Sequence, residues 1–142
     1  MEFKFRGKKV GSIESVLQGI KYKDKRTQNL VLQYKTSDAY HTRGCNQIDD
    51  WTKKQTLYWQ EKPINRQHQE YQNFLDELYF SVLKNPLYLR GLLASKGRYL
   101  LHHIGVTDSH FTVLTRYEYE SRINTLRDFA LQQIKKKKIK VK

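Results

Sequence analysis

A short segment near the start of the chain carries an acid, an amide and a base at helical spacing: Glu14, Gln18 and Lys21. At 100° per residue from Ile13, these positions lie near about 100°, 140° and 80°, beside the apolar side of the same helix. Ser12 is suited to cap this helix, which puts Glu14 in the first turn, where the positive helix end favours its ionised form. The spacing fits a ligand site, but spacing alone favours the solvent side of an ordinary amphipathic helix.

A second concentration of small polar groups lies between residues 105 and 115 and includes Asp108 and Thr112. Hydroxyl and carboxylate groups on a loop suit the binding of a sugar or a phosphate. The alternative is a plain connection whose side chains satisfy their own backbone, and the residues alone favour that interpretation.

The charge of the chain is strongly positive, at +13 from 27 Lys and Arg against 14 Asp and Glu. Six of these charges are lysines in the last eight residues, and subtracting six from +13 leaves +7 on the rest. Such an excess of positive charge favours the binding of a polyanion or a phosphorylated ligand. The lysine-rich end itself is equally well explained as a nucleic-acid-binding arm or as a solvated helix end.

The composition predicts one globular domain: the chain has 142 residues and 38% hydrophobic content. No segment approaches the roughly 20 apolar residues of a membrane helix, and the start has no apolar signal region. The single cysteine, Cys45, makes no internal disulfide, and the histidines and Cys45 lack zinc-ligand spacing. We therefore expect a cytoplasmic protein without a metal or cofactor, and no glycine-rich phosphate loop is present.

The hydrophobic pattern predicts an α+β fold, a mainly helical single domain with a small β-sheet. A domain of residues 1–133 is followed by a basic C-terminal tail of residues 134–142. The individual elements are strands at 3–6, 8–10, 56–59 and 98–104, helices at 12–22, 27–34, 37–43, 66–84 and 86–94, a turn at 60–63, and a last helix that begins with a capping box at 115–118.

Several short motifs in this order resemble the NADAR (YbiA-like) superfamily, over most of the chain up to about residue 131. The motifs are Phe5-Arg-Gly7, Ser12-Ile-Glu14 through Gln18-Gly-Ile-Lys21, Leu57-Tyr-Trp59, Pro63-Ile-Asn-Arg66, Glu70-Tyr71, Asn85-Pro, Leu92-Leu-Ala-Ser, Leu101-His-His-Ile-Gly105, Thr112-Val-Leu-Thr115 and Leu126-Arg127. The chain lacks the Trp-Gly-x-Gly segment of the YbiA branch and has Ile104-Gly-Val-Thr-Asp-Ser-His instead.

The resemblance implies a YbiA-like fold and an N-glycosidase, with Glu14, Gln18 and Lys21 as the catalytic residues. Cleavage of a C–N bond at ribose builds positive charge on the sugar, which a carboxylate such as Glu14 stabilises. Lys21 would protonate the leaving base or hold a phosphate, and Gln18 would orient the sugar or the water. Further residues are expected to bind the substrate. Trp59 would stack on the base, and Arg66 and the Asp108 to Thr112 loop would hold the diphosphate and the ribose. Ser12 is also expected to contact the substrate.

The functional hypothesis is removal of ADP-ribose from modified guanine in nucleic acid, chosen because the body of the chain is basic even without the terminal lysines. One alternative is hydrolysis of a free phosphorylated N-riboside or an NAD-like nucleotide. Another is a protein that binds nucleic acid or ADP-ribose without catalysis, using its tyrosines and basic surface. The expected partners are therefore an ADP-ribose-containing or phosphorylated N-riboside substrate and nucleic acid, with no membrane.

Overall fold

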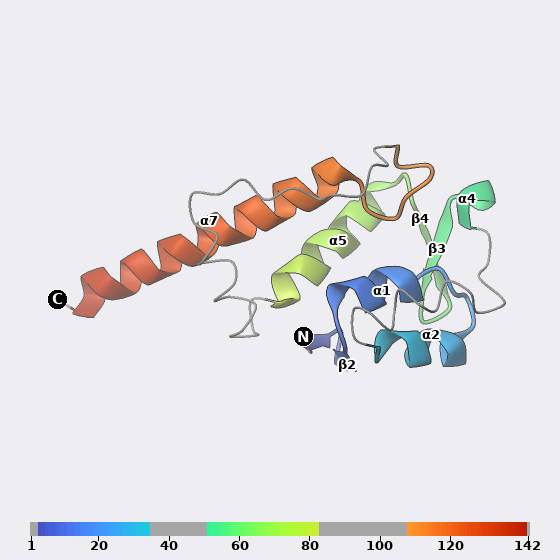
Figure 1. The fold of residues 1–142 in the computed structure, drawn as a ribbon, viewed down its shortest axis with the longest axis horizontal. Helices are drawn as coiled ribbons and strands as arrows, with labels where there is room; N and C mark the ends of the chain where they lie inside the picture. Colours follow the sequence, from blue (N-terminus) through green and yellow to red (C-terminus); the bar gives the residue numbers. More distant parts are fainter. Residues whose placement is uncertain (1–2, 35–50, 83–107, 142) are drawn as a thin grey trace.

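The computed structural model describes residues 3–34, 51–82 and 108–141, which form helices and two small antiparallel sheets. This arrangement confirms the predicted α+β class. The elements predicted at 37–43, 86–94 and 98–104 lie outside the described residues. In chain order the elements are β1 Phe3–Phe5, β2 Lys8–Val10, α1 Ile13–Gly19, α2 Lys25–Leu32, α4 Trp51–Lys54, β3 Thr56–Trp59, β4 Lys62–Asn65, α5 Gln69–Ser81 and α7 Arg116–Val141 (Figure 1).

The first hairpin pairs β1 with β2, with Phe3 opposite Val10 and Phe5 opposite Lys8. Its two turn residues, Arg6 and Gly7, both have positive φ angles of 51° and 80°. A two-residue turn of this kind matches the right-handed twist of the strands. Both phenylalanines are buried, as the alternation of apolar and basic residues predicted.

Helix α1 begins at a capping box in which each of two serines bonds the backbone of the other. The Ser12 hydroxyl accepts from the Ser15 backbone N–H at 3.0 Å, and the Ser15 hydroxyl accepts from the Ser12 N–H at 3.1 Å. The N-cap prediction is therefore confirmed. The helix ends at Gly19, earlier than predicted, so Lys21 lies in the turn that follows.

Helix α2 packs on α1 and joins it to β3 through one buried glutamine. The Gln28 amide donates to the carbonyl oxygens of Gly19, Tyr22 and Tyr58, at 2.8 to 3.2 Å. Its oxygen accepts from the backbone and side-chain N–H groups of Gln60. These bonds tie the C-terminal end of α1 to α2 and to β3.

The second hairpin pairs β3 with β4, with Leu57 opposite Ile64. The predicted turn at residues 60–63 is wrong in its extent, since only Gln60 and Glu61 form the turn, with φ angles of 50° and 72°. Pro63 lies within β4 instead. It is accommodated because a two-stranded sheet leaves one side of each strand without a partner strand.

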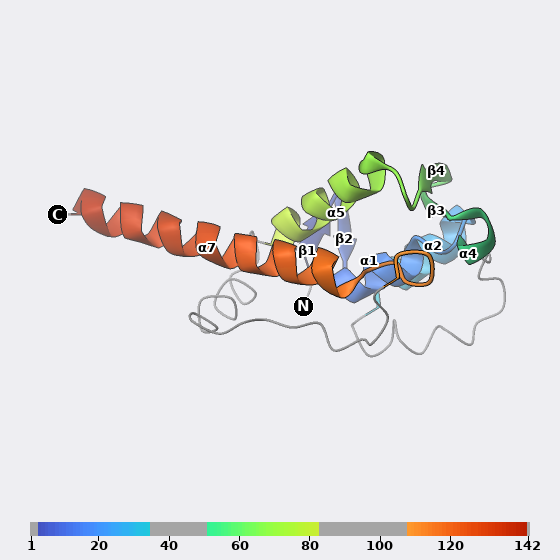
Figure 2. The same ribbon diagram turned by 90° about the horizontal axis from the view of Figure 1, so that it is seen from above.

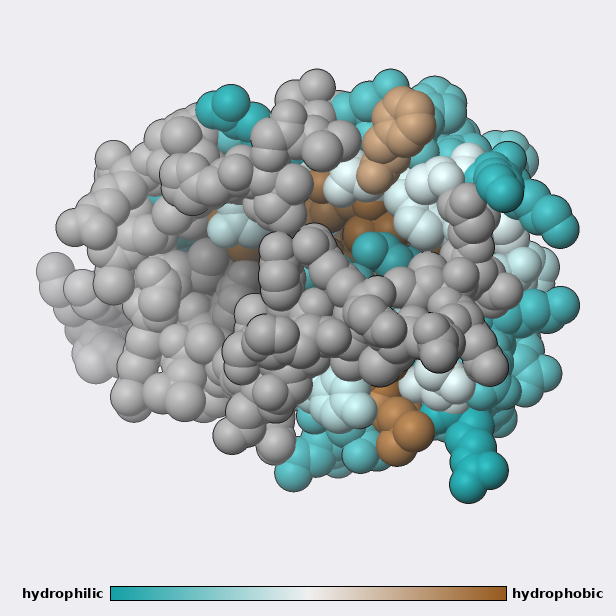
Figure 3. Space-filling model, turned by 45° about the vertical axis from the view of Figure 1, so that its right-hand side comes forward, coloured by the Kyte–Doolittle hydropathy of each residue, from teal (hydrophilic) through white to brown (hydrophobic). Residues whose placement is uncertain are grey.

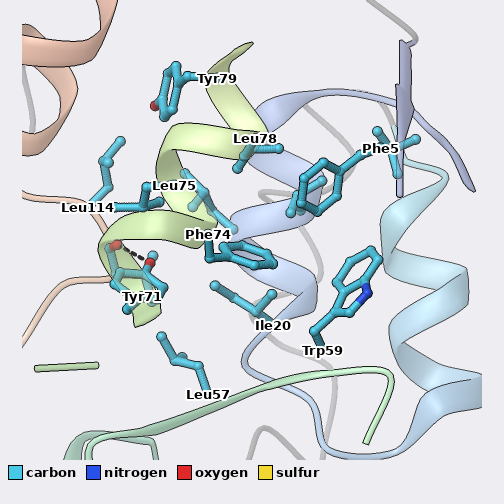
Figure 4. Packing of buried hydrophobic residues seen from close by; sticks show 14 of the residues in the cluster. Phe5, Ile20, Leu57, Trp59, Tyr71, Phe74, Leu75, Leu78, Tyr79 and Leu114 are labelled. Atoms are coloured by element: carbon cyan, nitrogen blue, oxygen red, sulfur yellow. Dashed lines mark hydrogen bonds between the residues drawn. The ribbon is translucent and has the colours of Figure 1, made fainter. Parts of the chain in front are cut away.

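Helix α5 is the central element of the core, as its apolar spacing predicted, although it begins at Gln69 rather than residue 66. Its buried face meets residues of both hairpins, α1 and the segment before α7 (Figure 4). The labelled core residues are Phe5, Ile20, Leu57, Trp59, Tyr71, Phe74, Leu75, Leu78, Tyr79 and Leu114. On the face in Figure 3 most outer described residues are hydrophilic, with strongly hydrophobic residues in the middle.

The last helix, α7, begins at the predicted capping box. The Glu118 N–H donates to the Thr115 hydroxyl at 3.1 Å, and the Thr115 N–H donates to the Glu118 carboxylate at 2.8 Å. The helix lies beside α5 in its first half and continues beyond it in both ribbon views (Figures 1 and 2). It runs to Val141, so the proposed boundary at residue 133 falls inside a helix.

Candidate functional site

The acid, the amide and the base identified in the sequence are joined by hydrogen bonds at the surface of α1. The Gln18 amide donates to the Glu14 carboxylate at 2.9 Å, and the Lys21 ammonium donates to the Gln18 oxygen at 3.0 Å. Gln18 is buried, whereas Glu14 and Lys21 are half-buried. We call Glu14, Gln18 and Lys21 the α1 row.

The α1 row is built by local geometry. Glu14 and Gln18 are four residues apart on α1 and therefore lie one above the other. Lys21, just past the helix end, reaches back to Gln18. The apolar side of α1 carries Val16 and Leu17, both buried in the core, so the helix holds the row in a fixed place.

The chemistry available to this row is that of a carboxylate and an ammonium group held apart by an amide. A carboxylate can stabilise a positive charge or accept a proton from water, and an ammonium group can donate a proton or bind a phosphate. Ser12, predicted to bind substrate, lies two residues before Glu14, and its hydroxyl caps the helix. Its oxygen therefore has a structural partner in the Ser15 backbone.

The structure places Arg66, which was predicted to hold a diphosphate, in the interior instead. Its side chain is 1% exposed and forms a two-pronged ion pair with Glu118, at 3.0 and 2.6 Å. The guanidinium Nε–H donates to the carbonyl oxygen of Thr112 at 2.9 Å. The guanidinium group thus joins the start of α7 and the segment before it to β4.

Glu118 is the centre of this buried cluster and receives hydrogen bonds from several directions. Besides Arg66, the Thr115 N–H and the Gln72 amide donate to its carboxylate. Burial raises the pKa of Glu118, but the hydrogen bonds from Arg66, Thr115 and Gln72 outweigh it, so the pKa lies below the usual value. We call Arg66, Gln72, Thr115 and Glu118 the Glu118 cluster.

Tyr71 lies next to the cluster and completes the attachment of the segment before α7. Its hydroxyl donates to the Val113 carbonyl oxygen, and the Arg66 guanidinium lies 4.6 Å from its ring centre. Burial raises the pKa of Tyr71, so the phenol stays protonated. The residues around Arg66 therefore form a structural unit, in which the N–H groups of the guanidinium donate to other groups of the protein.

Trp59, which was predicted to stack on the substrate base, lies in the hydrophobic core. The ring is 7% exposed and lies in edge contact with Phe5, at 5.1 Å, and in tilted contact with Phe74, at 5.9 Å between centres. It therefore packs within the core and presents no open face on which a purine could stack.

The predicted residues of the loop before α7 are satisfied by their neighbours. Asp108 accepts from the backbone N–H and lies 2.9 Å from the ring nitrogen of His110. The backbone N–H bond, followed by the ring contact, lowers the pKa of Asp108. The Thr112 hydroxyl accepts from the Leu114 N–H and donates to its carbonyl oxygen. These are the bonds of a plain connection.

Sequence reasoning missed the Glu118 cluster, although one signal for it was available. The capping box predicted that Glu118 would bond the Thr115 backbone, but nothing local indicated Arg66, 52 residues earlier. Among the described residues, no group of three His, Cys, Asp or Glu side chains could hold a metal ion. In the same part of the chain, no helix is both long enough and apolar enough to cross a membrane.

Together these features define a small, basic α+β protein with a polar row on one helix and a buried ion pair in its interior. The chain belongs to the family of bacteriophage protein GP30.3, whose model matches residues 1–128. No curated protein and no solved structure matches it significantly. The resemblance to the NADAR superfamily is therefore wrong, because the family that matches is a different one.

Several of the motifs behind that resemblance, within the described residues, have a structural explanation in this fold. Phe5-Arg-Gly7 forms a hairpin turn, Leu57-Tyr-Trp59 is a buried strand, and Thr115 caps a helix. Residues of these types recur wherever hairpins and capped helices are built. The catalytic roles that the resemblance assigned to the α1 row lose that support and rest on the geometry of the row alone.

Proposed function

We propose that the protein is a hydrolase that cleaves a ribose–base N-glycosidic bond, with ADP-ribose on a modified guanine of nucleic acid as its substrate. The observation that carries this proposal is the α1 row, in which Lys21 donates to Gln18 and Gln18 donates to Glu14. A carboxylate and an ammonium group, here linked by two hydrogen bonds through an amide, are the groups that such a cleavage needs.

In this mechanism the C–N bond between ribose and base breaks and a water oxygen bonds to the anomeric carbon. Glu14 stabilises the positive charge that develops on the sugar and takes the proton that the water loses. Lys21 gives a proton to the leaving nitrogen of the base, and Gln18 keeps the two charged groups apart and oriented. The products are ADP-ribose with a hydroxyl at its anomeric carbon and the unmodified guanine of the nucleic acid, so the overall reaction consumes one water.

Net charge supports a substrate carried by nucleic acid. The chain without its six terminal lysines is still at +7, obtained by subtracting six from +13, and a polyanion is held by such a field. The single cysteine suits a reducing compartment, and we propose the cytoplasm as the location.

Product analysis by mass spectrometry tests the proposal directly. Wild type, Glu14→Gln and Glu70→Gln are incubated with ADP-ribosylated DNA, and released ADP-ribose is quantified. Glu70 is a matched control because it also lies in the first turn of a helix and is exposed. We expect Glu14→Gln to lower the rate by about 10² to 10⁴ fold, with Glu70→Gln unchanged. Equal rates for Glu14→Gln and wild type would remove Glu14 from the reaction.

A free phosphorylated N-riboside or NAD-like nucleotide is the alternative substrate, and the same assay distinguishes it. Hydrolysis of the free nucleotide at a higher rate than the DNA adduct, unaffected by added DNA and by deletion of residues 135–142, would establish that alternative. That result would keep Glu14 as a catalytic residue and would change the proposed substrate from the DNA adduct to the free nucleotide.

A non-catalytic protein that binds nucleic acid or ADP-ribose is the second candidate function. It is favoured by one specific observation, the continuation of α7 as a helix through the lysines at 135–138 and 140. This candidate predicts that binding falls steeply with salt, survives Glu14→Gln and yields no product from any substrate of the panel.

A further inference from the structure

A surface groove separates α5 from α7 and has a volume of about 520 Å³. It takes no part in the proposed cleavage and contains no residue of the α1 row. Ten residues line it: Gln69, Gln72, Asp76, Tyr79, Phe80, Tyr117, Ser121, Arg122, Thr125 and Leu126.

Exposed aromatic rings border this groove. Tyr117 is 79% exposed and Phe80 is 54% exposed, and the ring of Phe80 lies 5.6 Å from that of Phe129, which is 38% exposed. Large rings left in water on adjacent helices are uncommon without a partner, because burying each of them is favourable. A flat ring with two accessible faces is also the group on which a nucleic-acid base stacks.

The two charged side chains that line the groove, Arg122 and Asp76, lie against each other, so the groove itself is close to neutral. Arg122 donates to the Gln72 side-chain oxygen at 2.8 Å and lies 3.0 Å from the Asp76 carboxylate. On the neighbouring side of α7, the Glu120 carboxylate pairs with Arg116 at 2.7 Å, and that of Asp128 lies 4.0 Å from Arg127. The groove therefore suits bases better than phosphates.

Positive charge lies beyond the groove, further along the same helix. Helix α7 continues beyond α5 (Figures 1 and 2) and carries lysines at 135–138 and 140. With a rise of 1.5 Å per residue, Tyr117 and Lys135 are separated by about 27 Å along one helix. Lys135 is exposed. The match to the GP30.3 family ends at residue 128, before these lysines begin.

We infer that single-stranded nucleic acid binds along this face, with bases stacked on Tyr117, Phe80 and Phe129 and phosphates neutralised by the lysines of α7. A duplex hides the faces of its bases and is bound more weakly. The inference deepens the proposed function by naming the form of the nucleic acid that carries the substrate, and it rests on that function in this respect only. Binding is measured separately from cleavage.

The test measures fluorescence anisotropy of a labelled DNA single strand of about 20 nucleotides, longer than the roughly 4 to 16 that one small binding domain covers. The first variant replaces Lys135, Lys136, Lys137 and Lys138 with Gln. Its matched control replaces four exposed lysines elsewhere, which are Lys4, Lys25, Lys54 and Lys62. Both remove four charges, but we expect only the first to reduce the slope of log affinity against log salt by up to about 3.

The aromatic contribution is tested with Tyr117→Ala against Phe111→Ala. Phe111 is 69% exposed but does not line the groove, which makes it a control for general loss of an exposed ring. We expect Tyr117→Ala to weaken binding to the single strand by about fivefold to a hundredfold, the range for one lost stacking contact. Phe111→Ala is expected to leave the affinity unchanged, and circular dichroism confirms that both variants are folded.

Three results would overturn the inference: equal loss from the two lysine variants, equal loss from the two aromatic variants, or a duplex bound as tightly as the single strand. A dimer in light scattering that Tyr117→Ala abolishes would assign the face to a second copy of the chain. Glu14→Gln is expected to bind the single strand like wild type, so failure of binding and failure of cleavage are observed independently.

Discussion

Two regions of this protein each combine a carboxylate, an amide and a cation, yet they are built in opposite ways. In the Glu118 cluster the ion pair is buried, with side-chain exposures of 1% and 7%, and its members come from β4, α5 and α7 or their ends. In the α1 row the three residues lie within eight positions of sequence, and Glu14 and Lys21 are half-buried.

The two regions also differ in the number of hydrogen bonds that their carboxylates receive. Glu118 receives bonds from Arg66, Thr115 and Gln72, and each kind of donor on the Arg66 guanidinium has a partner. The carboxylate of Glu14 receives one such bond among the described residues, from Gln18. A charge that the protein itself fully solvates has little left to offer a ligand. The Glu118 carboxylate thus has its hydrogen bonds supplied from three elements or their ends, whereas the described bond to Glu14 comes from one neighbour on its own helix.

The largest effect on stability is expected from Arg66→Met. Removing the guanidinium leaves the buried Glu118 carboxylate without its counter-ion, which costs about 3 to 5 kcal/mol of unfolding free energy. Urea denaturation followed by circular dichroism measures it. Arg116→Met is the control, since it breaks the more exposed pair with Glu120 and is expected to cost about 0.5 kcal/mol or less. Equal losses would show that the Glu118 cluster is no more structural than a surface pair.

Acid should destabilise the protein through the same cluster. The pKa of Glu118 is lower in the folded state than its usual value of 4.5, so the unfolded chain binds more protons and stability rises with pH. The contribution is fully present above about pH 4.5 and is lost as the pH falls through the folded-state pKa. Unfolding free energies measured between pH 6 and 3 are expected to fall more steeply in wild type than in Glu118→Gln. Parallel curves would contradict the assignment.

A smaller effect is expected from Thr115→Ala, which removes the hydroxyl that caps α7. Loss of such a cap costs about 1 kcal/mol. Thr125→Ala, an exposed threonine inside the same helix, is expected to be neutral or slightly stabilising because alanine favours the helix. Thermal unfolding of both variants measures the difference, and a neutral Thr115→Ala would show that the cap contributes nothing.

The smallest change in stability is expected from Glu14→Gln. The substitution loses the favourable interaction of a carboxylate with the helix start, worth about 0.3 to 1 kcal/mol, and Glu70→Gln in α5 should lose as much. The same urea titration measures both. A loss above about 2 kcal/mol would place Glu14 with the structural charges and contradict the distinction between the two regions.

The family assignment shows how far short motifs can be trusted in this chain. Several of the described residues that suggested the NADAR superfamily are hairpin, strand and cap residues, and such residues are selected by local geometry in many folds. The match to the GP30.3 family, in contrast, extends over residues 1–128.

The sequence by itself determined the features that depend on neighbours in the chain. The hairpin at Arg6-Gly7, the caps at Ser12 and Thr115, and the contact of Glu14 with Gln18 all follow from spacings of a few residues. The α+β class followed in the same way from the periodicity of apolar residues.

Only the tertiary structure decided which polar and aromatic residues are buried and what they meet. Arginine and tryptophan are residue types that often bind ligands. In this fold, however, Arg66 pairs with Glu118, 52 positions later, and Trp59 packs against Phe5 and Phe74. The aromatic groove between α5 and α7 likewise exists only because two helices distant in sequence lie side by side. The physical reason is that burial and long-range pairing depend on which faces pack together, and no local spacing determines that.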